Sequence, residues 1–200
     1  MASSKVRRIP RRKPTQERSK ETVRAIVEAA ARVLVERGYG GTNVNRVAER
    51  AGVSVGSLYQ YFPSKEALVA EVARDLAART IAIFQDGVVE LARLPLEEAV
   101  RGVIERAVRA LRLDPALRDV ILEEMPTEVF DTREFDDLLR DALRVYFLYG
   151  PHRVRPKNIE LALTILRSTV EAVARATSTE GFDPEEVVSE LTHLVFGYLR

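Results

Sequence analysis

Cysteine and tryptophan are absent from this chain of 200 residues, and histidine and methionine occur twice each. Without cysteine there is no disulfide framework, no thiol nucleophile and no zinc–thiolate site. The two histidines, His152 and His193, stand far apart in the sequence and outside any metal-ligand spacing. We therefore expect no metal site and no cofactor.

Long apolar runs and catalytic signatures are also missing. No stretch approaches the roughly 20 apolar residues that span a bilayer, and the N-terminus lacks the apolar segment of a secretory signal. There is no phosphate-cradling glycine loop and no nucleophile elbow. The acidic pairs at 123–124 and 136–137 are sequence neighbours, which point in different directions on a helix. The sequence predicts a soluble, cytoplasmic protein that is not an enzyme and has no membrane partner.

Charge is unevenly distributed along the chain, although the net charge is only +1. Residues 1–65 hold 14 lysines or arginines against 5 acidic residues, whereas residues 66–200 hold 17 against 25. The first part is therefore suited to meet a polyanion. Residues 1–14 predict a disordered basic arm, in which Arg11 and Arg12 would contact the DNA backbone or a minor groove. The alternative is a solvated tail that only aids solubility.

Apolar residues recur at helical spacing throughout the chain, without strand-like alternation, and predict an all-α fold of about nine helices. The first helix is expected from residue 15 or 19 to residue 37. Later helix starts are indicated at Ser64, Pro95, Asp114, Asp131 and Asp183. We expect a smaller helical domain over 15–65 and a larger helical domain over 66–200.

The stretch from 42 to 65, TNVNRVAERAGVSVGSLYQYFPSK, predicts two short helices joined by a tight turn. Gly52 lies where the chain must turn, and glycine adopts positive φ without a steric penalty. Ser54 is placed to cap the second helix, whose Leu58 and Phe62 point inward. The outward residues of that helix include no carboxylate, so it can enter a DNA groove. This pattern is typical of a helix-turn-helix.

Matching residues extend before and after the turn: RGY at 37–39, VAERAGVS at 47–54 and GSLYQYFPSKEAL at 56–68. With these elements, residues 16–76 resemble the N-terminal domain of the tetracycline-repressor (TetR/AcrR-like) family of bacterial transcriptional regulators. One departure is Asn43, where the family more often has threonine. Asparagine is an equally good helix cap, so the resemblance is little affected.

The predicted contacts with double-stranded DNA fall into three groups. The resemblance implies that Tyr59 and Lys65 contact phosphates, although Tyr59 could instead pack on the first helix. Short hydrogen-bonding residues at the helix starts are expected to reach the DNA backbone: Thr42, Asn43 and Ser57. The candidates for base edges are Asn45, Val55, Gly56, Gln60 and Tyr61. Arg46 and Arg50 are interpreted as solvated charges and are left out.

The last two helices carry wide apolar stripes, which suggests that a partner covers part of their surface. In the resembled family these helices form a four-helix dimer interface, and a homodimer would bind a palindromic site. The alternative is that both stripes serve only the core of one chain. The predicted interface residues are Leu163, Leu166, Val170, Val173, Val188, Leu191, Val195 and Tyr198.

The resemblance also implies a small-molecule effector inside the second domain, whose binding changes the separation of the two DNA-reading helices. An apolar lining would suit a hydrophobic or amphipathic effector. Taken singly, each candidate residue is more often ordinary core than a ligand contact. The candidates are Phe84, Val108, Leu111, Met125, Phe130, Leu139, Leu143, Tyr146 and Phe147.

Taken together, the sequence predicts a DNA-binding transcriptional regulator: a homodimeric repressor that binds a palindromic operator and is released by an effector. Repression is implied by the resemblance alone. One alternative is a DNA-binding activator or architectural protein without a ligand switch. The other is an all-helical interaction or enzyme domain in which the helix-turn-helix resemblance is coincidental.

Overall fold

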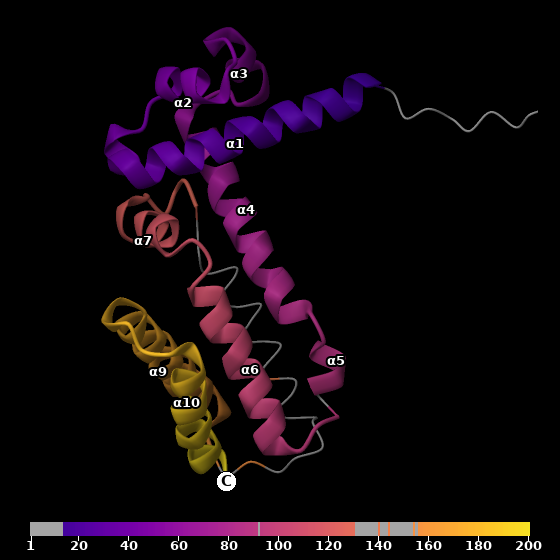
Figure 1. Cartoon of the computed structure of the whole chain (residues 1–200), viewed down its shortest axis with the longest axis vertical. Helices are drawn as coiled ribbons and strands as arrows, with labels where there is room; N and C mark the ends of the chain where they lie inside the picture. The colour runs from indigo at the N-terminus through magenta and orange to yellow at the C-terminus, as the bar shows by residue number, and fades with distance from the viewer. Residues whose placement is uncertain (1–13, 92, 131–139, 141–143, 145–153, 155) are drawn as a thin grey trace, which may run out of the picture. The chain divides into compact units, whose positions relative to one another are not determined.

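The structure is a computed structural model that describes residues 14–91, 93–130, 140, 144, 154 and 156–200. Every described element is an α-helix, which confirms the all-α prediction (Figure 1). The helix expected after Asp131 lies outside the described residues. So do six predicted site residues: Arg11, Arg12, Leu139, Leu143, Tyr146 and Phe147.

Contacts between residues divide the chain into two units, 1–72 and 73–200. The division falls within helix α4 (Lys65–Gln85). The domain boundary expected after residue 65 therefore coincides with the start of this helix, seven residues before the division between the units. The buried Leu68, Val69 and Val72 of α4 belong to the first unit.

The first unit is built from α1 (Pro14–Gly41), α2 (Val44–Ala51), α3 (Val55–Tyr61) and the first turns of α4. Helix α2 packs on α1, and α3 packs on α2 (Figure 1). Helical geometry in α1 is interrupted at Gly38, with φ 67° and ψ 177°, directly after the predicted helix end. The side chains that hold the three helices together are fully buried: Ile26, Leu34, Val47 and Leu58.

The second unit contains the rest of α4 together with α5 (Val88–Leu91), α6 (Leu96–Leu111), α7 (Pro115–Glu124), α9 (Ile159–Glu180) and α10 (Pro184–Leu199). Helix α6 packs against α9 and α10, which also pack on each other (Figure 1). Their apolar faces form one core, which includes Val100, Ile104 and Val108 of α6 and Val188, Leu191 and Val195 of α10.

Two of the predicted helix caps are confirmed by their hydrogen bonds. Ser64 Oγ accepts from the Ala67 amide at 3.1 Å at the start of α4. Asp183 Oδ1 accepts from the Glu185 amide at 3.2 Å at the start of α10. Such bonds satisfy amides that the first helical turn leaves without partners. None of the helices in the described ranges is long and apolar enough to cross a membrane.

Asp114 is the N-cap residue of α7, which begins at Pro115 as expected, but its side chain does not cap the helix. Asp114 has φ 47° and ψ 59° and makes no capping hydrogen bond. Its carboxylate instead accepts from Arg79 Nη1 on α4 at 2.8 Å. Arg79 Nε also lies 2.9 Å from Asp75, so one guanidinium holds two carboxylates. A long-range ion pair has therefore replaced a local cap.

Candidate nucleic-acid interface

Helix α2 begins at a side-chain cap and ends at a glycine turn. Asn43 Oδ1 accepts a hydrogen bond from the Arg46 amide at 3.0 Å. Gly52 follows the helix with φ 68° and ψ 29°, a left-handed conformation that glycine adopts without strain. The Val53 amide then donates to the Ala48 carbonyl at 3.0 Å. The turn that directs the chain into α3 is thus fixed by local geometry, as predicted.

Helix α3 is anchored by one polar cap and one buried leucine. Ser54 Oγ accepts from the Ser57 amide at 3.0 Å, and the two serine hydroxyls lie 2.8 Å apart. Leu58 is fully buried, and its carbonyl accepts from the Phe62 amide at 2.9 Å. A short helix held at both its start and its inner face can present only one face outward.

The outward face of α3 is small, polar and aromatic. Tyr59 is 49% exposed, and Gly56 and Gln60 are also exposed, whereas Val55 and Ser57 are half-buried. The exposure of Tyr59 argues against the alternative in which its ring packs on α1. No residue of α3 is acidic. A helix that presents such a face is able to approach phosphates and base edges without charge repulsion.

Two predicted contacts occupy less accessible positions. Thr42 is only 3% exposed, and its hydroxyl donates to the Gly38 carbonyl at 2.7 Å. Helical geometry is interrupted at Gly38, so the buried Thr42 hydroxyl closes the end of α1. Tyr61 is half-buried, with its hydroxyl 3.5 Å from Ser19 Oγ on α1. Asn43 and Asn45, in contrast, are exposed.

Lys65 is held by a residue to which the sequence argument gave no role. Its Nζ donates to the Tyr39 carbonyl at 3.1 Å and lies 4.1 Å from the centroid of the Tyr39 ring. This is a cation–π geometry. The available signal was an aromatic residue directly after Gly38, the glycine at which the helical geometry of α1 is interrupted. Tyr39 therefore positions the lysine predicted to contact phosphate.

The pKa shifts around Lys65 keep its neighbours in defined charge states. Burial raises the pKa of Tyr39, and the negative charge of Glu66 adds to this effect. The pKa of Glu66 is lowered by a hydrogen bond from its own backbone amide, with smaller contributions from the Ser64 hydroxyl and the charge of Lys65. At neutral pH Tyr39 is therefore a neutral phenol and Glu66 is a carboxylate.

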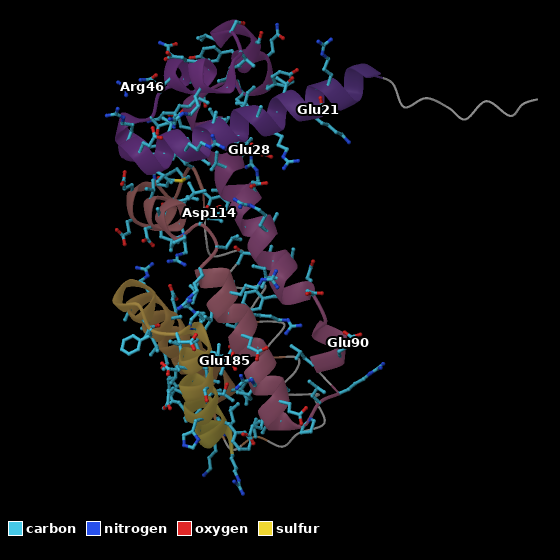
Figure 2. All side chains as sticks on the ribbon, in the orientation of Figure 1. Glu21, Glu28, Arg46, Glu90, Asp114 and Glu185 are labelled. Atoms are coloured by element: carbon cyan, nitrogen blue, oxygen red, sulfur yellow. The ribbon has the colours of Figure 1, made fainter. Side chains whose placement is uncertain are left out.

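The two arginines of α2 differ in their surroundings. Arg50 Nη1 lies 2.6 Å from Glu36 Oε1, which links α2 to α1. Arg46 is exposed on α2 (Figure 2). Its amide is the one that Asn43 caps, so its position is fixed while its guanidinium extends into solvent. Arg50 thus has a structural contact that the interpretation as a plain solvated charge missed.

The second unit contains a cavity of about 290 Å³. Side chains from α4, α6, α7, α9 and α10 line it, and most of them are apolar. Three predicted pocket residues are in its wall: Phe84, Leu111 and Phe130. Two others are not in the wall: Val108, which is buried in the helical core, and Met125, which follows the end of α7. The cavity also has a charged residue, Arg118, that the sequence argument did not consider.

Most of the predicted dimer-interface residues on α9 and α10 are buried or half-buried within the chain itself. Four of its residues are buried in the chain's own core: Leu163, Val188, Leu191 and Val195. Leu166, Val170 and Val173 are half-buried against that core. Of the predicted set, only Tyr198 is exposed. The apolar side chains that these two helices expose are Leu161 (55%), Ile165 (41%), Leu194 (54%) and Tyr198 (41%).

No group of three or more histidines or acidic residues in the described part of the chain could hold a metal ion. His193 is exposed on α10, and His152 lies outside the described residues.

Comparison with known proteins relates both units to one family. Residues 26–72 match the model for bacterial regulatory proteins of the tetR family, and residues 95–199 match that for the tetracyclin repressor-like C-terminal domain. The chain belongs to the TetR family. It is therefore a DNA-binding transcriptional regulator and not an enzyme. The helix-turn-helix of α2 and α3 lies within the first matched segment.

Individual TetR-family proteins are similar to this chain over most of its length. The transcriptional repressor AcnR of Corynebacterium glutamicum is 30% identical, covering 94% of this chain and 95% of its own. A TetR-family regulator from Mesorhizobium loti has a structure with a TM-score of 0.74 at 21% sequence identity. The match covers 90% of this chain and 96% of that protein's chain. The structure of FadR of Bacillus subtilis, solved in complex with stearoyl-CoA, has a TM-score of 0.71 at 19% sequence identity. The match covers 88% of this chain and 99% of the FadR chain. The two solved structures share the fold of this chain.

Proposed function

We propose that this TetR-family regulator is a homodimer that represses transcription by binding a two-fold symmetric operator. It leaves the DNA when a hydrophobic or amphipathic small molecule occupies the cavity of the second unit. The observation that carries the proposal is the outward face of α3, which is exposed, free of acidic residues and fixed by the Ser54 cap. Such a protein acts in the cytoplasm and is nucleoid-associated while bound to DNA.

We assign some of the described residues to contacts with bases and others to contacts with phosphates. Gln60 has the amide needed to bind adenine in bidentate fashion, and Val55 is suited to contact a thymine methyl group. Gly56 lets the backbone approach closely. Phosphate contacts are assigned to Tyr59, Lys65 and the exposed Asn43, with Ser57 nearby on α3. The positive charge of the N-terminal segment supports further backbone or minor-groove contacts by Arg11 and Arg12.

Dimerisation is supported by the exposed apolar surface of α9 and α10. On each helix the exposed residues are four apart, Leu161 with Ile165 and Leu194 with Tyr198, so each pair forms one stripe. Water-exposed apolar stripes on neighbouring helices favour association with a second copy. One helix-turn-helix covers little DNA, and a dimer gains specificity by binding two half-sites.

Release by an effector needs only that the ligand prefer the state that cannot bind DNA. The half-sites of a symmetric operator repeat every ~34–36 Å, so a modest change in the separation of the two α3 helices prevents simultaneous docking. The cavity of about 290 Å³ is just below the roughly 300–1,000 Å³ range of small-molecule sites, and its wall is mainly apolar. The stearoyl-CoA complex of FadR supports an acyl-like ligand in this fold.

A binding-site selection from genomic fragments, performed with purified protein at near-physiological salt, tests the proposal. We expect a shared two-fold symmetric motif. The Gln60→Ala variant should change which bases are preferred, whereas Val35→Gln, a polar change at an exposed position of α1, should recover the same motif. Recovery of fragments without a common motif would support an architectural role, and no recovery at all would contradict DNA recognition by α3.

A further inference from the structure

Arg118 is a charged side chain in the mainly apolar wall of the cavity. It belongs to α7, and its side chain is only 14% exposed. The wall around it includes Leu111, Leu113 and Ile121. A guanidinium withdrawn from water into such surroundings is costly unless it is paired and fully hydrogen-bonded.

The partners of Arg118 use only part of its guanidinium. Nη1 donates to the Leu111 carbonyl in the last turn of α6. Nη2 lies 3.4 Å from Asp119 Oδ1, a carboxylate that is 46% exposed and also lies 3.8 Å from Arg175 Nη2. Nε is buried and has no hydrogen-bond partner among the residues that the structure describes. The edge formed by Nε and Nη2 therefore retains donor capacity.

The other polar side chains of the wall are already engaged. Thr80 Oγ1 donates to the Leu76 carbonyl at 2.9 Å. Arg167 pairs with Glu171 on the same helix at 3.3 Å, and these two side chains are 42% and 38% exposed. Arg118, with a side chain that is 14% exposed, is thus the more deeply placed of the two cations.

We propose that the effector is an amphipathic carboxylate, with its apolar chain in the cavity and its carboxylate on the Nε–Nη2 edge of Arg118. This inference rests on the proposed function of the cavity as an effector site. A carboxylate accepts two parallel hydrogen bonds from a guanidinium edge and supplies the missing negative charge. An ester, an alcohol or an acyl thioester places only a neutral group next to the chain, so it satisfies the donors without compensating the charge.

The test compares the binding of sodium dodecanoate, methyl dodecanoate and dodecanol by titration calorimetry, with the full-length protein and without DNA. We expect the acid to bind about tenfold or more tightly than the ester, because its hydrogen bonds to the guanidinium join two charged groups. In Arg118→Gln the acid and the ester should bind equally. Arg112→Gln is the matched control: Arg112 also has a buried Nε without a partner, but it is not in the cavity wall. This control should keep the preference for the acid.

Several results would overturn the proposal. One is equal binding of acid and ester by the unaltered protein, a comparison that does not depend on any variant folding. Another is a retained preference in Arg118→Gln. A third is no binding of dodecanoate, octanoate or hexadecanoate. If a neutral apolar compound releases the protein from its operator while the acids do not, the carboxylate assignment fails and the ligand switch stands. If no specific DNA fragment is recovered, the regulatory proposal fails, whatever the cavity binds.

Discussion

Lys65 and Tyr39 form a pair in which the lysine Nζ lies 4.1 Å from the ring centroid and donates to the tyrosine carbonyl at 3.1 Å. The pair joins the first residue of α4 to the end of α1. A lysine held in this way has less side-chain entropy to lose when it binds a phosphate. The charge of Lys65 and its contact with the Tyr39 ring can be tested separately.

Removing the charge with Lys65→Met should weaken binding to all DNA sequences and reduce the slope of log affinity against log salt by about one. Removing the ring with Tyr39→Leu keeps the charge. It should weaken binding by about two- to fivefold without changing that slope, since a cation–π contact contributes about 0.5–1 kcal/mol. Fluorescence anisotropy at several salt concentrations measures both effects. Tyr39→Phe is the control and should bind as the unaltered protein does; an unchanged slope in Lys65→Met would rule out the phosphate contact.

Ser54 allows the stability of α3 to be separated from its DNA binding. Ser54→Ala removes the oxygen that accepts from the Ser57 amide and should lower the free energy of unfolding by about 1 kcal/mol. Ser54→Asp restores a capping oxygen and should retain the stability, but its charge opposes the DNA phosphates. Urea unfolding and anisotropy on the same preparations distinguish the two quantities. Undiminished DNA affinity in Ser54→Asp would place the start of α3 away from the DNA.

Gly52→Ala tests the turn between α2 and α3. Gly52 has φ 68°, and an added Cβ would meet no atom within 4 Å, so the cost is conformational. We expect a loss of about 1–2 kcal/mol in the free energy of unfolding. Gly40→Ala also meets no atom within 4 Å, and Gly40 lacks the positive φ, so this control should be neutral or slightly stabilising. Equal unfolding free energies for the two variants would contradict the argument.

Leu194→Glu tests the dimer surface. Leu194 is 54% exposed on α10, and a charge there should disrupt association without disturbing the core of one chain. Val35→Glu changes a residue of α1 that is 44% exposed, and this control should remain dimeric. Light scattering after size-exclusion chromatography gives the mass of each species. A dimeric Leu194→Glu variant would move the interface away from this stripe.

Local signals were sufficient for the starts and ends of the helices. The cap at Ser54 and the turn at Gly52 depend on residues within a few positions, so both could be predicted from the sequence. The caps at Ser64 and Asp183 were found for the same reason. The buried Leu58 and Phe62 also follow from helical spacing in the motif.

Long-range contacts account for the features that the sequence did not reveal. Asp114 has a good local capping signal, but Arg79, 35 residues away in the chain, binds its carboxylate. The stripes of α9 and α10 are wide enough to serve a core and an interface. Only the packing of α6 shows that Leu191 faces inward and Leu194 outward. No local sequence pattern indicates that Arg118 lies in the cavity wall, because its burial depends on the assembly of several helices.

The most direct test of the central claim is a hydroxyl-radical footprint of the protein on a DNA fragment recovered by selection. We predict two protected patches related by two-fold symmetry, with centres ~34–36 Å apart or a multiple of that distance, as expected when two α3 helices occupy successive major grooves on one face of the duplex. Asymmetric protection by a single copy, or protection without a fixed position, would contradict a dimeric regulator that recognises DNA through α3.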